Sequence, residues 1–221
     1  MKNYKYYSII TGVFVAALLI SNILDTKVFM FYGLALPAGI ILFPIVYIFG
    51  DIFTEVYGYK ASRKAIWTGF FSLLMAVVFF KIGEMIKPAP FWEHQEAFKS
   101  ILGKVPRIAI ASVTAYFLGE FTNSVILSKM KLKSKGKSMP LRFIVSTIFG
   151  EGVDTTVFVL IAFLGLMSFG DLVNVILSAW IFKVAWEVIA LPISLPLVKW
   201  LKRVENEDHF DTDENYNPFK L

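Results

Sequence analysis

Cysteine is absent from the 221-residue sequence, and histidine is nearly so, with only His94 and His209. Without thiols, disulfide frameworks, thiolate metal sites and thiol catalysis are excluded, and two distant histidines cannot form a histidine-rich metal cage. The sequence also lacks a Walker A phosphate loop, a nucleophile elbow and a zinc signature of the H-E-x-x-H type. An enzymatic function therefore has no chemistry to rest on, and we predict no enzyme activity, no cofactor and no metal site.

Charge is scarce as well, since only 18% of the residues are charged while 57% are hydrophobic. A soluble domain has about a quarter charged and about half apolar residues, so this composition predicts an all-α integral membrane protein. The formal net charge of +5 could indicate nucleic-acid binding in a soluble protein. Here the basic residues lie between apolar runs, where membrane topology explains them better, and we expect no nucleic-acid partner.

Six hydrophobic segments are long enough to cross a bilayer, which takes roughly 20 mainly apolar residues. They lie near residues 8–25, 30–50, 65–86, 106–128, 142–168 and 172–199. Helix-breaking residues interrupt the second segment, namely Pro37, Gly39, Pro44 and Gly50. A broken or tilted helix is expected there. Residues 1–203 are thus predicted to form one domain of six transmembrane helices.

The first hydrophobic segment follows Lys2 and Lys5 and could be mistaken for a secretory signal. A cleavable signal ends in small residues of the A-x-A type, whereas this segment ends in Ser-Asn-Ile-Leu-Asp at 21–25. Five further hydrophobic segments follow it. We therefore interpret it as the first membrane span.

The distribution of lysine and arginine predicts the orientation in the membrane. If both termini are cytoplasmic, the cytoplasmic segments hold 14 of these residues and the outer segments hold 5. The positive-inside rule therefore favours a cytoplasmic N-terminus and C-terminus. The basic run between Lys129 and Lys137 is then a topology anchor rather than a lipid or nucleic-acid contact.

Two polar segments lie outside the predicted spans. The loop at 87–105 mixes prolines and aromatic residues with acids, and we expect it at the outer interface, either as part of an aromatic belt or as an external lid. The cytoplasmic tail at 204–221 is short, polar and rich in acids. Such a composition predicts disorder rather than a cation site.

Two similar strings stand 31 residues apart, each in the middle of a hydrophobic segment. They are Gly119-Glu120-Phe-Thr-Asn123-Ser124 and Gly150-Glu151-Gly-Val-Asp154-Thr155. An acidic side chain in hydrocarbon costs at least a few kcal/mol, so such groups indicate function. Glu120 and Glu151 each lie nine residues from the basic connection between their segments. At about 1.5 Å per residue, both carboxylates are then roughly 13 Å deep, near the bilayer midplane.

Within each string the polar residues recur at i+3 and i+4, so they share one helix face. We expect the two faces to meet in a polar pocket, flanked by Gly119, Gly150 and Gly152, where small residues allow close helix approach. The alternative is that these groups only join the helices by hydrogen bonds. Such bonds contribute about 1 kcal/mol each in membranes, too little to offset three buried acids, which favours a binding site.

Two further polar clusters are candidate parts of the same machinery. In the last segment, Lys183 and Glu187 are spaced i, i+4 between two tryptophans, and they either neutralise one another or line the pocket. At the inner end of the second segment, Asp51 and Glu55 share a helix face. They either form salt bridges with Lys60, Arg63 or Lys64, or act as an inner gate.

Four strings resemble the queuosine precursor transporter family, also called the vitamin uptake transporter family. They are Ser21-Asn22-Ile23 with Lys27, FPIVYIFGDIFTEVYGYKASRKAIWTGF (43–70), ASVTAYFLGEFTNSVILSKMK (111–131) and RFIVSTIFGEGVDTTVFVLIAFLG (142–165). The resemblance covers about residues 20–190. It implies a multi-pass importer in the bacterial cytoplasmic membrane whose substrates are 7-deazaguanines, the cyano- or aminomethyl-substituted precursors of queuosine. By this resemblance the family's polar motif positions are Asp51, Glu55, Arg63, Glu120, Asn123, Arg142, Glu151 and Asp154.

The chemistry of these residues agrees with such a substrate. A guanine-like edge offers two adjacent N–H donors that a carboxylate can accept together, while Asn123 can satisfy the ring carbonyl. We expect Glu120 or Glu151 to bind this edge, and the other acid or Asp154 to meet the 7-substituent. Candidate stacking partners for the ring are Tyr116, Trp180 and Trp186. Protonation of a glutamate is one way to couple uptake to a proton gradient.

Two other functions stay open. Small size, six helices and no nucleotide motif also fit a substrate-capture subunit of an ATP-driven vitamin or nucleobase uptake complex. A structural or assembly membrane protein is disfavoured by the buried acids. The preferred precursor, the coupling to protons and a homodimeric working unit are not decided by the sequence.

Overall fold

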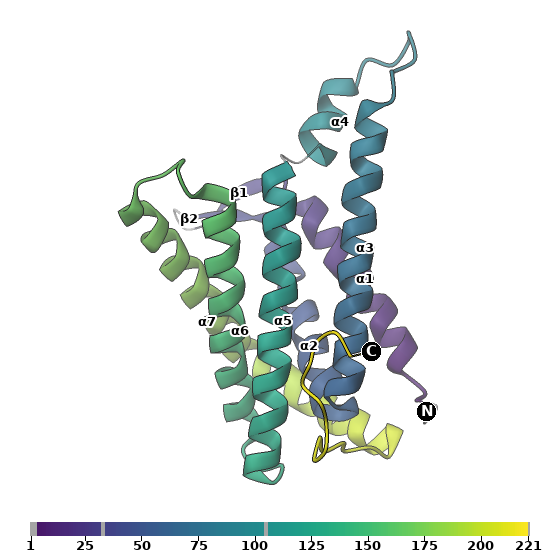
Figure 1. Ribbon diagram of the computed structural model, residues 1–221, viewed down its shortest axis with the longest axis vertical. Coiled ribbons are helices and arrows are strands. Elements are labelled where there is room, and N and C mark those ends of the chain that lie inside the picture. Colours follow the sequence, from purple (N-terminus) through teal and green to yellow (C-terminus); the bar gives the residue numbers. More distant parts are fainter. Residues whose placement is uncertain (1–3, 32–33, 104–105, 221) are drawn as a thin grey trace.

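The computed structural model describes residues 4–31, 34–103 and 106–220. Over these residues the chain is mainly helical, and five of its helices are long and apolar enough to cross a membrane. They are α1 (Tyr7–Leu24), α3 (Tyr59–Met85), α5 (Pro106–Ser134), α6 (Met139–Phe163) and α7 (Phe169–Glu205), and Figure 1 shows them gathered in one bundle. The predicted class of α-helical membrane protein is therefore confirmed, and five of the predicted spans coincide with these helices.

The predicted second span, near residues 30–50, is not a single helix, so the predicted count of six spanning helices is not supported. A two-stranded hairpin and two short helices occupy this region, namely β1 (Val28–Phe31), β2 (Leu34–Pro37), the 3-10 helix η1 (Ala38–Ile41) and α2 (Phe43–Tyr57). With 15 residues, α2 is about 22 Å long. Pro44 lies in its first turn, where a residue without an N–H is tolerated, so the helix begins there rather than earlier.

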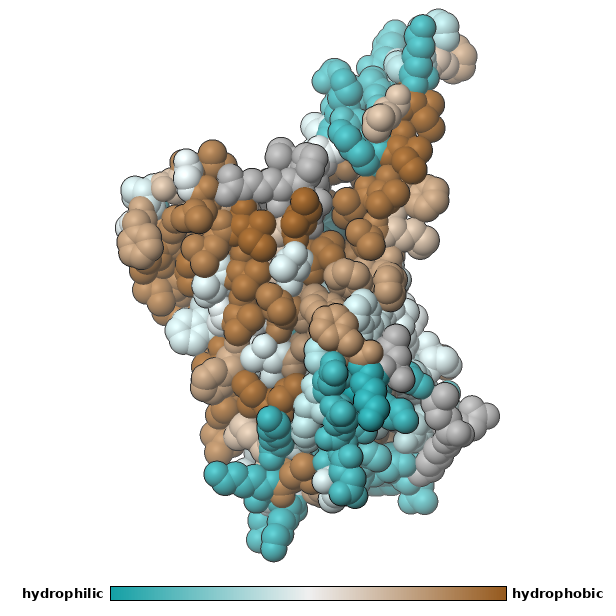
Figure 2. Space-filling view, viewed as in Figure 1, coloured by the Kyte–Doolittle hydropathy of each residue, from teal (hydrophilic) through white to brown (hydrophobic). Residues whose placement is uncertain are grey.

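The surface of the bundle changes in hydropathy along its length. Figure 2 shows apolar side chains over its middle and hydrophilic side chains at both ends. One end carries α4 (Gln95–Leu102), a short helix from the loop predicted at 87–105, none of whose residues is buried. The other end carries the α5–α6 connection and the residues after α7, and we call it the basic end. An apolar band between two polar ends is the pattern expected of a membrane protein.

The residues that follow α7 pack against the basic end, so the prediction of a disordered tail at 204–221 is wrong. Asp211 accepts hydrogen bonds from the backbone N–H of Tyr59 at 3.0 Å and from the Ser128 hydroxyl at 2.5 Å. Trp67 donates to the Pro218 carbonyl at 2.7 Å. The acidic composition that suggests disorder in isolation is here matched by polar and basic partners on the helices.

Helices α5 and α6 approach each other closely at the glycines of the two repeated strings. A Cβ atom added to Gly119 would lie 2.7 Å from the Cβ of Asp154, and one added to Gly150 would lie 2.7 Å from the Cβ of Asn123. Each glycine thus faces the polar residue four positions after the other glycine. The two strings meet reciprocally and at the same depth, as their spacing predicts.

Replacing Gly150 by Ala is expected to lower the free energy of unfolding by about 1–3 kcal/mol, because the new methyl group must push α5 and α6 apart. Thermal unfolding of the purified protein in detergent measures this. The matched control is Gly12→Ala on α1, where no atom lies within 4 Å of the added Cβ and alanine favours the helix. Equal unfolding temperatures for the two variants would contradict the close approach.

Candidate functional site

A cavity of about 880 Å³ lies between the helices of the bundle. Its walls come from α1, α2, α5, α6 and α7, and α4 contributes Lys99 and Ser100. The polar residues that line it on or next to α1, α2, α5, α6 and α7 include Ser21, Asn22, Asp25, Tyr47, Asp51, Glu120, Asn123, Thr147, Glu151, Asp154, Thr155 and Lys183. The acids of both repeated strings therefore lie on one cavity, as the sequence predicts.

Three charged groups on one side of the cavity form a compact ion-pair cluster. The ammonium group of Lys183 on α7 lies 2.8 Å from Oε2 of Glu151 and 2.5 Å from Oδ2 of Asp154, both on α6. Tyr47 on α2 lines the same cavity as this cluster. Of the two roles considered for Lys183, the geometry therefore favours lining the pocket over neutralising Glu187.

Glu120 on α5 stands apart from that cluster. Its side chain is half-buried and lines the cavity, and among the described residues it has neither a hydrogen bond nor an ion pair. Space for it is provided by Gly50 on α2, where an added Cβ would lie 3.1 Å from Oε2 of Glu120. Glu120 therefore presents a carboxylate to the cavity that no described cation neutralises.

The neighbouring polar residues tie α5 to α2 and α3. Asn123, one turn after Glu120, donates through Nδ2 to Oδ1 of Asp51 at 3.2 Å. Asp51 is only 1% exposed although it contributes to the cavity wall. The hydroxyl of Tyr116 donates to the carbonyl of Ile66 on α3 at 3.2 Å. These contacts fix the orientation of three side chains that face the cavity.

Three of the residues predicted to bind substrate do not line the cavity, namely Trp180, Trp186 and Glu187. Trp180 donates its indole N–H to the carbonyl of Ile148 at 2.8 Å, and Trp186 stacks on Phe182 with a ring separation of 6.4 Å. Aromatic rings at the wall are instead those of Phe158, Phe163 and Phe182, together with Tyr47 and Tyr116.

Three polar residues of the cavity wall were not predicted as site residues, namely Tyr47, Ser21 and Asp25. A signal for Tyr47 was available, because it lies four residues before Asp51 and therefore on the same face of α2. Ser21 and Asp25 are related in the same way at the end of α1. Asn22, which the sequence predicts as a gate residue or a structural polar residue, lines the cavity and donates to the carbonyl of Leu18 at 3.0 Å.

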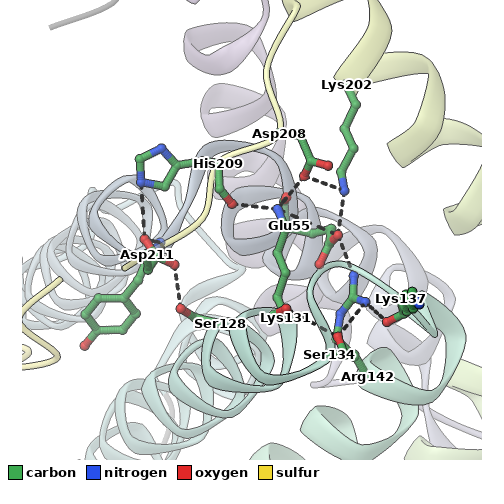
Figure 3. A network of polar contacts seen from close by, with 11 residues as sticks. Glu55, Ser128, Lys131, Ser134, Lys137, Arg142, Lys202, Asp208, His209 and Asp211 are labelled. Carbon is green, nitrogen blue, oxygen red and sulfur yellow. Dashed lines mark hydrogen bonds and ion pairs between the residues drawn. The ribbon is translucent and has the colours of Figure 1, made fainter. Parts of the chain in front are cut away.

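A second polar cluster lies at the basic end, with Glu55 of α2 at its centre (Figure 3). Oε1 of Glu55 lies 2.6 Å from Arg142 of α6, 2.6 Å from Lys202 of α7 and 3.8 Å from Lys131 of α5. Asp208 is shared by the two lysines, at 2.6 Å from Lys131 and 2.8 Å from Lys202. We call these five residues the Glu55 cluster.

Arg63, one of the three cations considered as partners of Asp51 and Glu55, pairs with neither of them among the described residues. Arg63 instead pairs with Glu214 at 3.3 Å, and its NH1 donates to the carbonyls of Asn215 and Asn217. Glu55 thus joins four helices by ion pairs, whereas Arg63 holds the chain after α7 against α3.

The packing of the tail shifts the pKa values of its charged residues. Burial alone would raise the pKa of Asp211, but hydrogen bonds from His209, Ser128 and the Tyr59 N–H lower it. The pKa of His209 is raised, mainly because His209 hydrogen-bonds to Asp211. Burial likewise opposes a lower pKa at Asp208, but its hydrogen bonds to Lys131 and Lys202 lower it. Each shift favours the charged form, so the tail docks as an ion-paired segment.

Sequence comparison places the chain among known proteins. The profile of a family described as "Putative vitamin uptake transporter" matches residues 37–197, which is most of the chain. The chain belongs to the vitamin uptake transporter family. Together with the five long apolar helices, this membership makes the protein a multi-pass membrane transporter and confirms the prediction that it is not an enzyme.

Two curated relatives of this vitamin uptake transporter carry the name "Probable queuosine precursor transporter". The protein from Bacillus subtilis is 27% identical over 187 residues, which are 84% of this chain and 81% of the relative. The protein from Haemophilus influenzae is 28% identical over 128 residues, which are 57% of this chain and 51% of the relative. No solved structure matches this chain.

Proposed function

We propose that this vitamin uptake transporter imports queuosine precursors, 7-cyano-7-deazaguanine or 7-aminomethyl-7-deazaguanine, across a bacterial cytoplasmic membrane. The names of both curated relatives support this substrate class. The observation that carries the proposal is the carboxylate of Glu120, which faces the cavity with no hydrogen bond or ion pair among the described residues. An acid in this position is expensive unless a ligand with N–H donors meets it.

The guanine-like edge of the substrate is assigned to Glu120 and Asn123. A 7-deazaguanine presents a ring N–H and an exocyclic amino group side by side, and one carboxylate accepts both. Asn123 lies one turn further along the same face of α5. Its Nδ2 already donates one hydrogen to Asp51, and the second hydrogen can reach the ring carbonyl.

The 7-substituent is assigned to the cluster of Lys183, Glu151 and Asp154. This cluster offers both an ammonium donor and carboxylate acceptors within 2.8 Å of one another. A cyano nitrogen would accept from Lys183, whereas an aminomethyl ammonium would compete with Lys183 for the two carboxylates. The cluster therefore distinguishes the two precursors by charge.

The flat ring is assigned to the apolar walls between these two polar groups. A cavity of about 880 Å³ falls within the range of small-molecule sites. Its aromatic wall residues Phe158 and Phe182 can stack on a base. In this arrangement Trp180 and Trp186 support the wall from behind instead of touching the substrate.

We propose that the Glu55 cluster is the closed inner gate, that the basic end is cytoplasmic, and that α4 is an outer lid. Lysine and arginine enrichment at the basic end supports this orientation. The cavity includes Lys99 and Ser100 of α4 among its lining residues but no member of the Glu55 cluster. Substrate would then enter beside α4 and leave after the ion pairs of Glu55 separate.

A binding titration of the purified protein with both precursors and with guanine tests the proposed function. We expect saturable binding of at least one precursor and weaker binding of guanine, which lacks the 7-substituent. Absence of binding by both precursors would refute the substrate class. Uptake by the purified protein alone in liposomes separates a complete transporter from a capture subunit, which would bind substrate without transporting it.

A further inference from the structure

Glu187 is a buried acid that the substrate site does not use. It lies on α7, is 1% exposed and does not line the cavity. Both of its carboxylate oxygens are buried, and neither has a hydrogen-bond partner among the described residues. Lys183 lies one turn earlier on the same helix, but its ammonium group is held by Glu151 and Asp154. Glu187 therefore lacks the groups that stabilise a buried negative charge.

An ionised carboxylate in such surroundings carries a large desolvation cost, which a buried acid avoids by binding a proton. The charged and titratable groups near Glu187 add to this cost. They are Asp51 on α2 and Glu151 on α6, both within electrostatic reach of it, with Glu120 on α5 next to these two. Lys183 is already shared by two acids, so no described cation pairs with Glu187.

Asp51 connects Glu187 to the cavity. It lies on α2, which packs against α7, and it is almost fully buried while still forming part of the cavity wall. Asn123 donates to its Oδ1, whereas its Oδ2 has no partner among the described residues. Asp51 therefore lines the cavity and lies within electrostatic reach of Glu187 on the packed helix α7.

Glu120 is not expected to carry the proton that accompanies the substrate. To accept two N–H donors it has to stay ionised while substrate is bound. If proton and substrate are carried together, the proton has to bind an acid other than Glu120 while the substrate is bound.

We propose that Glu187 is the proton-binding site that couples import to the proton gradient, with Asp51 as its entry from the cavity. This inference rests on the proposed function and deepens it by separating the proton site from the substrate site. One proton moves from the outer solution through the cavity and Asp51 to Glu187. It is released to the cytoplasm when α7 and α2 move apart as the inner end opens, so that one proton accompanies the substrate and none is consumed.

The test uses purified protein in liposomes that contain a pH-sensitive dye, with 7-cyano-7-deazaguanine and 7-aminomethyl-7-deazaguanine as probes. Wild-type protein is expected to acidify the interior when substrate is added outside. Glu187→Gln keeps the size of the side chain but cannot bind and release a proton. It is expected to retain the wild-type Kd and the exchange of preloaded substrate, and to lose both acidification and gradient-driven uptake. Glu187→Asp, which keeps a titratable group, is expected to retain acidification.

Three results would overturn the inference, and they differ from a failure of the proposed function. Uptake by wild-type protein without acidification would exclude proton coupling. Unchanged acidification by Glu187→Gln would place the proton site elsewhere, and a lost affinity in this variant would place Glu187 in the substrate site. If Glu187→Gln does not fold, Asp51→Asn has to lose acidification for the inference to stand. Absence of binding to wild-type protein would instead refute the proposed substrate.

Discussion

Replacing Glu120 by Gln is expected to abolish precursor uptake while membrane insertion and thermal stability are retained. The carboxylate of Glu120 is proposed to accept two N–H donors of the substrate, whereas an amide turns its NH₂ toward one of them. Losing two charge-assisted hydrogen bonds costs about 3–6 kcal/mol, which corresponds to at least a hundredfold weaker binding. Uptake of labelled precursor by cells that lack other importers, together with titration of the purified variant, measures the effect.

Glu93→Gln is the matched control, because Glu93 is an exposed carboxylate in the segment before α4 and does not line the cavity. It is expected to transport like the wild type. Glu151→Gln is also expected to lose uptake, but in this variant Lys183 and Asp154 lose a partner, so its stability has to be compared as well. Normal uptake by both Glu120→Gln and Glu151→Gln would refute the assignment of the site.

Depth and helix face were predictable for the repeated strings because both follow from spacing along a regular helix. Glu120 and Glu151 lie on one cavity, and the glycines before them meet reciprocally. The surroundings of Glu187 were not predictable in this way. Spacing shows that it shares a face with Lys183, but it does not show which neighbouring helix covers that face. In the structure, Lys183 lines the cavity and Glu187 is buried outside it.

The second span was mispredicted because apolar composition alone does not distinguish a membrane helix from a short hairpin. The segments Val28–Phe31 and Leu34–Pro37 are apolar, yet they form two paired strands instead of helix. Pro37 and Pro44 indicated a break in this segment. They could not indicate how large the break is, because that depends on contacts with other helices.

The order of the tail after α7 was not predictable from its own composition. Its polar, acidic composition predicts disorder when it is considered alone. The partners that hold it lie far away in the sequence, such as Arg63 for Glu214 and Lys131 for Asp208. Sequence patterns within one segment carry no information on such long-range ion pairs, and the same holds for the cations that surround Glu55.

Glu55→Gln is expected to lower the free energy of unfolding by about 3–5 kcal/mol, the usual effect of removing one partner from a buried ion pair. The Glu55 side chain is fully buried, and its Oε1 lies between Arg142, Lys202 and Lys131. Without this carboxylate, three cations from three helices repel one another around Asp208 alone. Thermal and denaturant unfolding in detergent measure the loss.

Two further variants test whether the loss of stability in Glu55→Gln comes from the Glu55 cluster. Glu96→Gln removes a carboxylate whose side chain is 86% exposed in a surface pair, and it is expected to leave stability unchanged. Adding Lys202→Met to Glu55→Gln removes one of the repelling cations and is expected to recover part of the loss. If Glu55→Gln unfolds like the wild type, the cluster does not hold the basic end together, and its proposed role as the inner gate loses its energetic basis.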